Sequence, residues 1–308
     1  MYPRRTLAPV AAAAAFLVAA CGSPEAPAAS DEPTIVASID VYGSVARAVG
    51  GDLVEVNSLL SDPSADPHSY ESTPADAVAV ADADVVVLNG GGYDEFMSKL
   101  VESTDPGRSA IDVSALSGLE PAAAEASDHG EFNEHVWYSL PTVQKLATRL
   151  AADLGAADPP DAARYTANAE AFNKQVAALI GRVQAIGTPG TRVAVTEPVP
   201  GYLIEQAGLV DATPEEFAEA VEEDSDPPAA VVQETLALFT GPDPVRALIV
   251  NSQTRTPTTD QVRATAEAAG VPVVTMSETL PAGTADYVSW MSGQIDALTA
   301  ALARGRTS

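Results

Sequence analysis

The chain has 308 residues and a formal net charge of −27 at pH 7, with 43 acidic against 16 basic residues. Nucleic acids attract proteins of the opposite charge, so this composition excludes a nucleic-acid partner. An acidic surface favours cations over anionic ligands, although solubility alone can also account for it. Cys21 is the single cysteine, so the fold has no internal disulfide and must rest on a packed core.

Residues 1–21 are predicted to be a lipoprotein signal peptide. Two arginines precede an apolar run, Leu7 to Ala20, that is too short to span a bilayer comfortably. The small residues before Cys21 resemble a bacterial lipobox, in which the cysteine is lipidated and becomes the new N-terminus. An ordinary secretion signal is the alternative. Acyl chains on Cys21 would anchor the protein to the outer face of the cell membrane without a spanning helix.

Residues 22–33 consist almost entirely of Ala, Pro, Ser and acidic residues, which predicts a flexible tether. Residues 34–156 then alternate between strand and helix patterns and predict an N-terminal α/β lobe. Apolar runs bounded by turn residues are typical of parallel strands buried on both faces. The predicted strands of this lobe are 34–38, 53–60 and 85–88.

Residues 157–189 are predicted to form a long linking helix. Its apolar residues are spaced alternately by four and three positions: Tyr165, Ala169, Phe172, Val176, Leu179, Val183 and Ile186. A two-stranded coiled coil would show the same spacing. The α/β pattern on both sides favours instead a rigid spine helix that lies across two lobes.

Residues 190–308 repeat the alternation and predict a C-terminal α/β lobe, with strands at 192–195, 247–250 and 271–274. The predicted fold class is therefore α/β, with two lobes, each a mostly parallel sheet flanked by helices. One long spine helix joins them. Strand ends and loops converge between such lobes, which favours a ligand site in the cleft.

The three histidines, His68, His129 and His135, all lie in short polar segments beside carboxylates. Imidazole is the commonest protein ligand for transition metals, and a neighbouring carboxylate can orient it. Each histidine taken alone is more often a solvated loop residue. Glu197 and Glu278 come directly after predicted strands of the second lobe and are the candidate carboxylate ligands, although a lone glutamate there is usually only solvated.

Three segments together resemble the signature segments of the zinc/manganese substrate-binding lipoproteins of bacterial ABC importers, the cluster A-I solute-binding proteins. They are Asp66-Pro67-His68-Ser69-Tyr70-Glu71, Asn133-Glu134-His135-Val136-Trp137-Tyr138 and Thr196-Glu197-Pro198. The similarity extends from about residue 34 to residue 302. It implies one divalent metal held between two α/β lobes.

The resemblance implies a metal ligand set of His68, His135, Glu197 and Glu278. Asp286 lies near enough in the sequence to compete with Glu278 for the last position. Zinc-type members often carry a long His-rich acidic loop before the second histidine. The corresponding stretch here, 125–134, is short and contains only His129, so a metal-capture role for that residue stays open.

Two imidazoles and two carboxylates would fill a tetrahedral zinc shell or most of a manganese shell, so the ion is expected to be Zn²⁺ or Mn²⁺. The resulting hypothesis is a monomeric, lipid-anchored extracytoplasmic receptor that delivers the ion to an ABC importer permease. A metal-dependent surface adhesion protein is the alternative. An exported metallohydrolase is less favoured, since no His-Glu-x-x-His motif occurs, and we expect no enzymatic activity.

Overall fold

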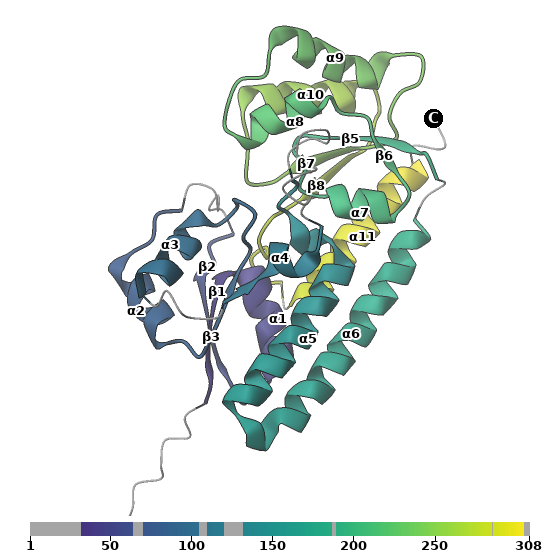
Figure 1. Ribbon diagram of the computed structural model, residues 1–308. Coiled ribbons are helices and arrows are strands. Elements are labelled where there is room, and N and C mark those ends of the chain that lie inside the picture. The colour runs from purple at the N-terminus through teal and green to yellow at the C-terminus, as the bar shows by residue number, and fades with distance from the viewer. Residues whose placement is uncertain are drawn as a thin grey trace, which may run out of the picture. The chain divides into compact units, whose positions relative to one another are not determined.

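A computed structural model describes residues 32–63, 70–104, 110–119, 132–186, 189–284 and 286–304 (Figure 1). The predicted signal peptide, Cys21 and most of the predicted tether lie outside these residues, and so do His68 and His129. Among the described helices, none combines the length and the apolar character needed to cross a membrane. Glu32–Ser308 form one compact unit.

The first sheet has four parallel strands in the order β2-β1-β3-β4. Its strands are β1 (Thr34–Ile39), β2 (Glu55–Leu60), β3 (Val85–Leu88) and β4 (Ile111–Asp112). Alternate residues of β3 enter two different core clusters, because successive side chains of a strand point to opposite faces. The continuous apolar sequence of β3 therefore reflects a strand that is buried on both faces of the sheet.

Helices connect these strands and cover the sheet (Figure 1). They are α1 (Asp40–Gly50), α2 (Pro74–Asp82), α3 (Glu95–Thr104), α4 (Val113–Ser117) and α5 (Leu140–Ala157). Thr73 caps α2: its hydroxyl accepts from the Asp76 backbone N–H, and the Asp76 carboxylate accepts in return from the Thr73 backbone N–H. This capping box, with Pro74 in the first turn, fixes where the helix begins.

The long predicted helix is α6 (Ala162–Gln184), and it packs against α5, α1 and α11 (Tyr287–Arg304). Six of the seven residues of the apolar pattern are buried in it, as the spacing predicts. The helix ends before the seventh, since the N–H groups of Ala185 and Ile186 bond three residues back, in a tightened last turn. Neighbouring helices of the same chain thus bury the face that a coiled-coil partner would have covered.

The second sheet repeats the arrangement of the first, with four parallel strands in the order β6-β5-β7-β8. The strands are β5 (Arg192–Val195), β6 (Val210–Asp211), β7 (Leu248–Asn251) and β8 (Val273–Met276). Its helices are α7 (Gly201–Gln206), α8 (Glu215–Glu222), α9 (Ala229–Thr240), α10 (Pro257–Ala268) and, last, α11.

The predicted fold class of two parallel sheets flanked by helices, with one long helix, is confirmed. The exact lobe boundaries stay a prediction. Strand β8 begins two residues later than predicted, because the Val271 N–H bonds to the Ala266 carbonyl and so closes the end of α10. Four of the helices and strands were not predicted from the sequence: α3, α4 and the two-residue strands β4 and β6.

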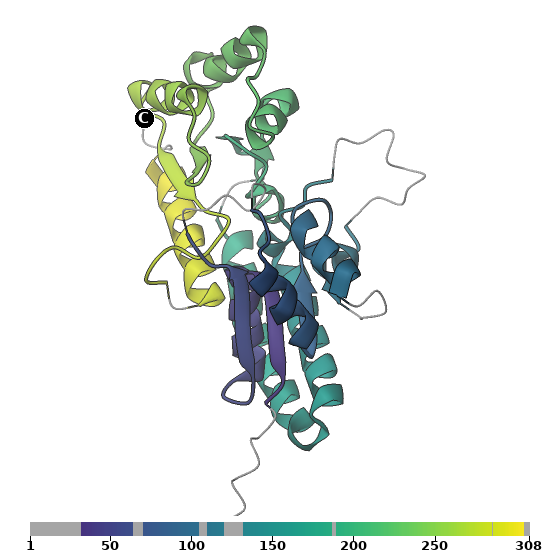
Figure 2. The ribbon, with the colours of Figure 1, turned by 90° about the vertical axis from the view of Figure 1, so that its left-hand side faces the viewer.

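The segment between β8 and α11 connects the second sheet with the first lobe. Tyr138 donates its hydroxyl to the Ser277 carbonyl at 2.7 Å, and the Tyr287 backbone N–H donates to Ser44 Oγ at 2.8 Å. Helix α11 contacts both β8 and α1. Figure 2 shows this helix, in yellow, running from beside the first lobe toward the second sheet.

Candidate metal site

His135 is buried, with 1% of its surface exposed, and lies directly before a short 3-10 turn, Val136–Tyr138. All three residues of that turn are fully buried. The ring of His135 stands 5.1 Å from the Trp137 ring and 5.8 Å from the Tyr93 ring, centroid to centroid. The apolar turn therefore anchors the backbone beside His135 and holds its imidazole in place.

Asn133 orients the imidazole of His135. Its Oδ1 lies 2.9 Å from His135 Nδ1 and accepts from the His135 backbone N–H at 3.0 Å, and its Nδ2 donates to the Pro198 carbonyl at 2.8 Å. An amide oxygen can only accept, so Nδ1 of the imidazole carries the hydrogen. The lone pair of a neutral ring is then on Nε2, the nitrogen that a metal would bind.

Glu197 and Glu278, here named the carboxylate pair, are 3% and 1% exposed. Glu197 follows β5 and Glu278 follows β8, at the carboxyl ends of strands in the same parallel sheet. The side-chain amide of Asn251, the last residue of β7, donates to both, at 2.8 Å to Glu197 and 2.7 Å to Glu278. The structure thus brings these two predicted residues together through one amide.

His135 and Glu278 also approach each other, with 3.9 Å between His135 Nε2 and Glu278 Oε2. A carboxylate that sequence reasoning missed is closer: Glu222 Oε1, at the end of α8, lies 3.5 Å from the same nitrogen. Three other glutamates lie on that short helix, so the sequence resembles a solvated acidic face and gives no signal that singles out Glu222.

Asp286 is placed differently from Glu278. Its Oδ1 accepts from the Ser289 backbone N–H at 2.7 Å, and its backbone carbonyl accepts from the backbone N–H of Trp290. Asp286 therefore caps the first turn of α11. Glu278 instead accepts a hydrogen bond from the hydroxyl of Tyr93, in the first lobe, at 2.9 Å. Of the two acids that compete for the last position, Glu278 is the one beside His135.

Tyr93 is brought to this place by three glycines that follow β3. Gly90, Gly91 and Gly92 have φ angles of 71°, 64° and 101°, in the left-handed region that favours glycine. Burial, with the nearby Glu278 carboxylate, raises the pKa of Tyr93 well above its usual value. The phenol is therefore neutral and can donate its hydrogen to the carboxylate.

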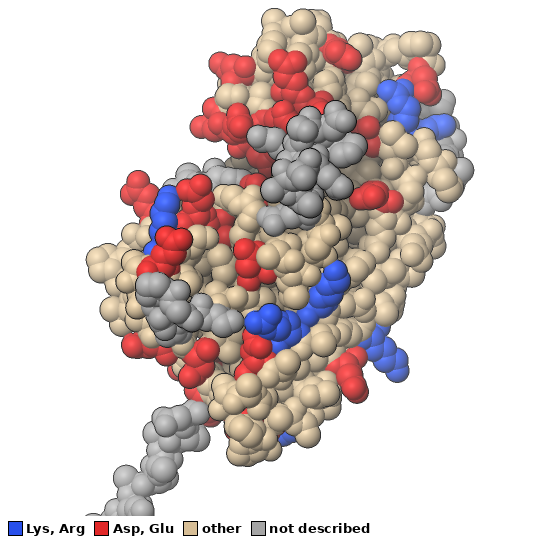
Figure 3. Space-filling view, viewed as in Figure 1, with Lys and Arg blue, Asp and Glu red and all other residues tan. Residues whose placement is uncertain are grey.

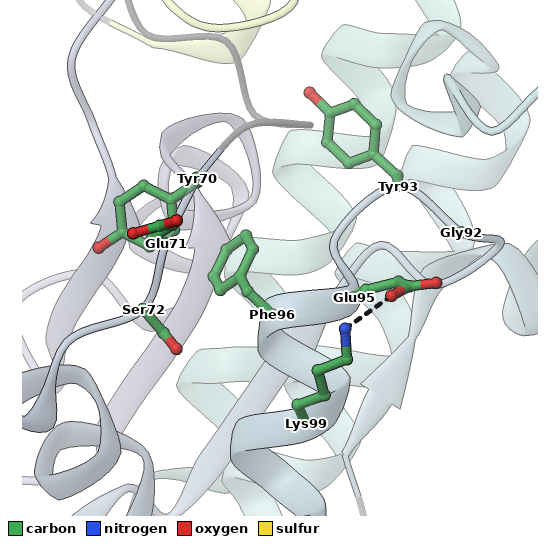
Figure 4. A pocket seen from close by; sticks show the side chains of 8 residues that line it. All are labelled: Tyr70, Glu71, Ser72, Gly92, Tyr93, Glu95, Phe96 and Lys99. Atoms are coloured by element: carbon green, nitrogen blue, oxygen red, sulfur yellow. Dashed lines mark hydrogen bonds and ion pairs between the residues drawn. The ribbon is translucent and has the colours of Figure 1, made fainter. Parts of the chain in front are cut away.

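Tyr93, which bonds to Glu278, also lines a pocket of about 480 Å³ (Figure 4). Tyr70 and Phe96 line it in edge-to-face contact, with ring centroids 4.7 Å apart, and an exposed ion pair between Lys99 and Glu95 also lines it. In Figure 4 the Tyr93 hydroxyl points away from Lys99. The pocket therefore borders the candidate site through Tyr93.

One face of the second lobe carries many acidic side chains. Figure 3 shows Asp and Glu side chains gathered on this face near the position of α8, with few basic side chains among them. Helix α8 carries Glu215 and Glu216 in its first turn and ends in Glu222. A concentration of carboxylates of this kind attracts cations toward the site.

In the parts of the chain that the structure describes, no group of three or more His, Cys, Asp and Glu side chains is arranged to hold a metal ion. His68, one of the four predicted ligands, lies outside those parts. The other three predicted ligands, His135, Glu197 and Glu278, are described and lie near one another. The carboxylates of the two glutamates accept hydrogen bonds from Asn251, and that of Glu278 accepts another from Tyr93.

Residues 35–301 match the profile of a family described as the periplasmic zinc-uptake complex component A. The manganese-binding lipoprotein MntA of Halalkalibacterium halodurans is 34% identical over 161 residues, 51% of each chain. The iron-binding protein YfeA of Yersinia pestis is 28% identical over 146 residues, 47% of this chain and 46% of YfeA. The chain thus spans about half the length of these relatives.

Two solved structures share the fold over most of their length. The substrate-binding protein FpvC of Pseudomonas aeruginosa in complex with Mn²⁺ has a TM-score of 0.71 at 25% identity, covering 88% of this chain and 98% of FpvC. The periplasmic zinc-binding protein TroA of Treponema pallidum has a TM-score of 0.69 at 20% identity, covering 88% and 99%. The second likeness shows the fold alone.

The family model covers nearly the whole of the described chain, and its members are metal-binding substrate-binding proteins of ABC transporters, not enzymes. The chain therefore belongs to the family of periplasmic zinc-uptake complex component A proteins.

Proposed function

We propose that this chain is a lipid-anchored extracytoplasmic receptor that binds one divalent transition metal ion, Zn²⁺ or Mn²⁺, and delivers it to the permease of an ABC importer. His68, His135, Glu197 and Glu278 are the proposed ligands. Cys21 is the proposed site of lipidation. The relatives bear the names of manganese- and iron-binding proteins, which supports a divalent metal and leaves its identity to experiment.

One observation carries the proposal: a buried imidazole oriented by Asn133 faces a buried carboxylate from the other lobe, at 3.9 Å between His135 Nε2 and Glu278 Oε2. Buried charges need a partner of opposite sign, and a divalent cation between these groups would supply it. An ion held by ligands of both lobes would also join the lobes together. Binding would draw His135 and the carboxylate pair toward the ion together with His68.

The test is metal analysis of the full chain and of a variant with His68→Ala and His135→Ala. The unaltered chain should bind one ion, and the double variant should lose binding, because two carboxylates alone make a weak, open site. Stoichiometric binding retained by the double variant would contradict the proposed ligand set. Competition between Zn²⁺ and Mn²⁺ on the unaltered chain then measures which ion it prefers.

A further inference from the structure

The start of α7, in the second lobe, holds Asn133 of the first lobe. The Pro198 carbonyl accepts two hydrogen bonds, from the Gly201 backbone N–H at 2.8 Å and from Asn133 Nδ2 at 2.8 Å. A carbonyl oxygen has two lone pairs, so it can accept both donors. The Tyr202 hydroxyl donates to the Asn133 backbone carbonyl at 2.5 Å. This part of the second lobe therefore holds both the side chain and the backbone of a first-lobe residue.

Gly201 allows this approach because it has no side chain. A Cβ at this position would lie 2.6 Å from Asn133 Nδ2, whereas an ordinary van der Waals contact is about 3.5 Å. The amide cannot move away without loss, since its nitrogen and its oxygen both make hydrogen bonds. The backbone beside it is held independently, because Asn89 Nδ2 donates to the Glu134 carbonyl at 2.9 Å. A side chain at position 201 would therefore displace the amide and leave the backbone in place.

The direction of the Asn133 amide decides which nitrogen of His135 carries the hydrogen. With Asn133 Oδ1 2.9 Å from Nδ1, the hydrogen is on Nδ1 and the lone pair of the neutral ring is on Nε2. In solution, a histidine ring carries its hydrogen mainly on Nε2. An amide that loses its bond to Pro198 can turn its N–H groups toward the ring or move away from it, and either change favours the hydrogen on Nε2. A metal cannot bind a ring nitrogen that carries a hydrogen.

We propose that Gly201 is a positioning residue for His135. It lets the second lobe hold the Asn133 amide in the direction that puts the hydrogen of the imidazole on Nδ1 and its lone pair on Nε2. The lobe that carries Glu197 thus sets the tautomer of a histidine in the other lobe. The consequence for metal binding rests on the proposed function, whereas the tautomer can be measured without any ion.

The experiment compares the full chain with Gly201→Ala, using Gly181→Ala as the matched control. Both glycines lie in helices, at φ angles outside the left-handed region, but a Cβ at Gly181 would meet no atom of the described residues within 4 Å. The ¹⁵N NMR shifts of the His135 ring, identified by their loss in His135→Ala, report its tautomer. They are recorded in chelator-treated protein at about pH 8.5, where a histidine ring is ordinarily neutral. Dissociation constants for Zn²⁺ and Mn²⁺ are measured separately by chelator competition.

The unaltered chain should carry the His135 hydrogen on Nδ1. Gly201→Ala should move most of it to Nε2 and weaken metal binding by about 10- to 100-fold, the usual effect of losing a group that orients a ligand. Gly181→Ala should change neither. An unaltered tautomer in folded Gly201→Ala would overturn the inference. An unaltered chain that binds neither ion would contradict the proposed function instead and would leave the tautomer result standing.

Two further variants separate this role from a general disturbance of the fold. Asn133→Ala should give the same tautomer as Gly201→Ala, and the double variant should match both, because Gly201 acts through that amide. A further shift in the double variant would contradict action through Asn133. Tyr202→Phe removes the hydroxyl that holds the Asn133 carbonyl and adds no atom, so it decides the matter if Gly201→Ala fails to fold. It should shift the ring in the same direction, and an unaltered tautomer would then overturn the inference.

Discussion

At the scale of single residues, the most informative contact is that between Asn133 and His135. Because Asn133 Oδ1 accepts from the ring and from the backbone of His135, it fixes both the tautomer and the direction of the imidazole. Its Nδ2 holds the Pro198 carbonyl, just after Glu197 in the chain. The Asn133 amide therefore contacts both His135, a proposed ligand of the first lobe, and the segment that carries Glu197, a proposed ligand of the second lobe.

Asn133→Ala should weaken metal binding by about 10- to 100-fold, because the imidazole loses the group that selects its tautomer. Asn133→Asp keeps an acceptor for Nδ1–H but loses the donor to Pro198, so it should retain more affinity than the Ala variant. Metal titration of both variants measures the order. Equal affinities for the two variants would show that the acceptor oxygen does not matter.

The histidine itself could be predicted from the sequence, since an imidazole in an acidic segment is a recognisable metal-binding feature. Asn133, Asn251 and Tyr93 could not be, because amides and phenols occur in loops of every kind. Their roles depend on which carboxylate or imidazole the fold places within hydrogen-bond distance.

At the scale of elements, the turn after β3 determines where Tyr93 lies. A Cβ at Gly90 would lie 2.4 Å from Asp112 Oδ1, and the φ angle of 71° already disfavours a side chain. Asp112 cannot move away cheaply, since its Oδ1 caps α4 by accepting from the Ala115 N–H at 2.8 Å. The glycine turn and the cap of α4 are therefore coupled.

Gly90→Ala should lower the free energy of unfolding by about 2–4 kcal/mol, from left-handed strain together with a disturbed helix cap. Gly270→Ala is the matched control: its φ is 74°, and a Cβ there would meet no atom of the described residues within 4 Å. This control should cost only about 1 kcal/mol. Urea unfolding measures both, and similar losses would rule out the contact with Asp112 as a cause.

The three glycines after β3 can be recognised in the sequence as the end of an apolar strand. The requirement for glycine at position 90 cannot be recognised there, because the atoms that a side chain would meet belong to the carboxyl group of Asp112, more than twenty positions later in the chain. Likewise β4 and β6, with two residues each, are too short to show a period, and only pairing with β3 and β5 makes them strands.

At the scale of the whole molecule, Asp40 joins the first lobe to the segment that carries Glu278. This first residue of α1 is 7% exposed, and its two carboxylate oxygens each lie 3.2 Å from the Leu280 backbone nitrogen, which donates to them. Burial raises the pKa of Asp40 to about 6, and the hydrogen bond from Leu280 and the charge of Arg47 offset only part of that increase.

Because the folded-state pKa lies above the ordinary 3.8, the contribution of Asp40 to stability is fully present below about pH 4. It is lost as the pH rises through about 6, by up to about 3 kcal/mol. Asp40→Asn cannot ionise, so in chelator-treated protein it should become more stable relative to the unaltered chain between pH 4 and pH 7.

Urea unfolding of both proteins at several pH values measures this difference. Asp52→Asn makes the same change at an exposed carboxylate, which pairs with Arg164 at the surface, and so serves as the control for the substitution itself. A difference between Asp40→Asn and the unaltered chain that does not change with pH would show that burial does not perturb the Asp40 carboxyl group.

Local patterns in the amino-acid sequence were enough to predict the parallel α/β architecture, the apolar face of the long helix and the types of residue suited to a metal site. These properties depend on local periodicity and on side-chain chemistry, which neighbouring positions display directly. Tertiary structure alone decided that Glu222 lies 3.5 Å from His135 Nε2 and that Asn251 ties Glu197 to Glu278. Those contacts join residues far apart in the chain, and distance in the sequence carries no information about which strand ends and loops the packed core will bring together.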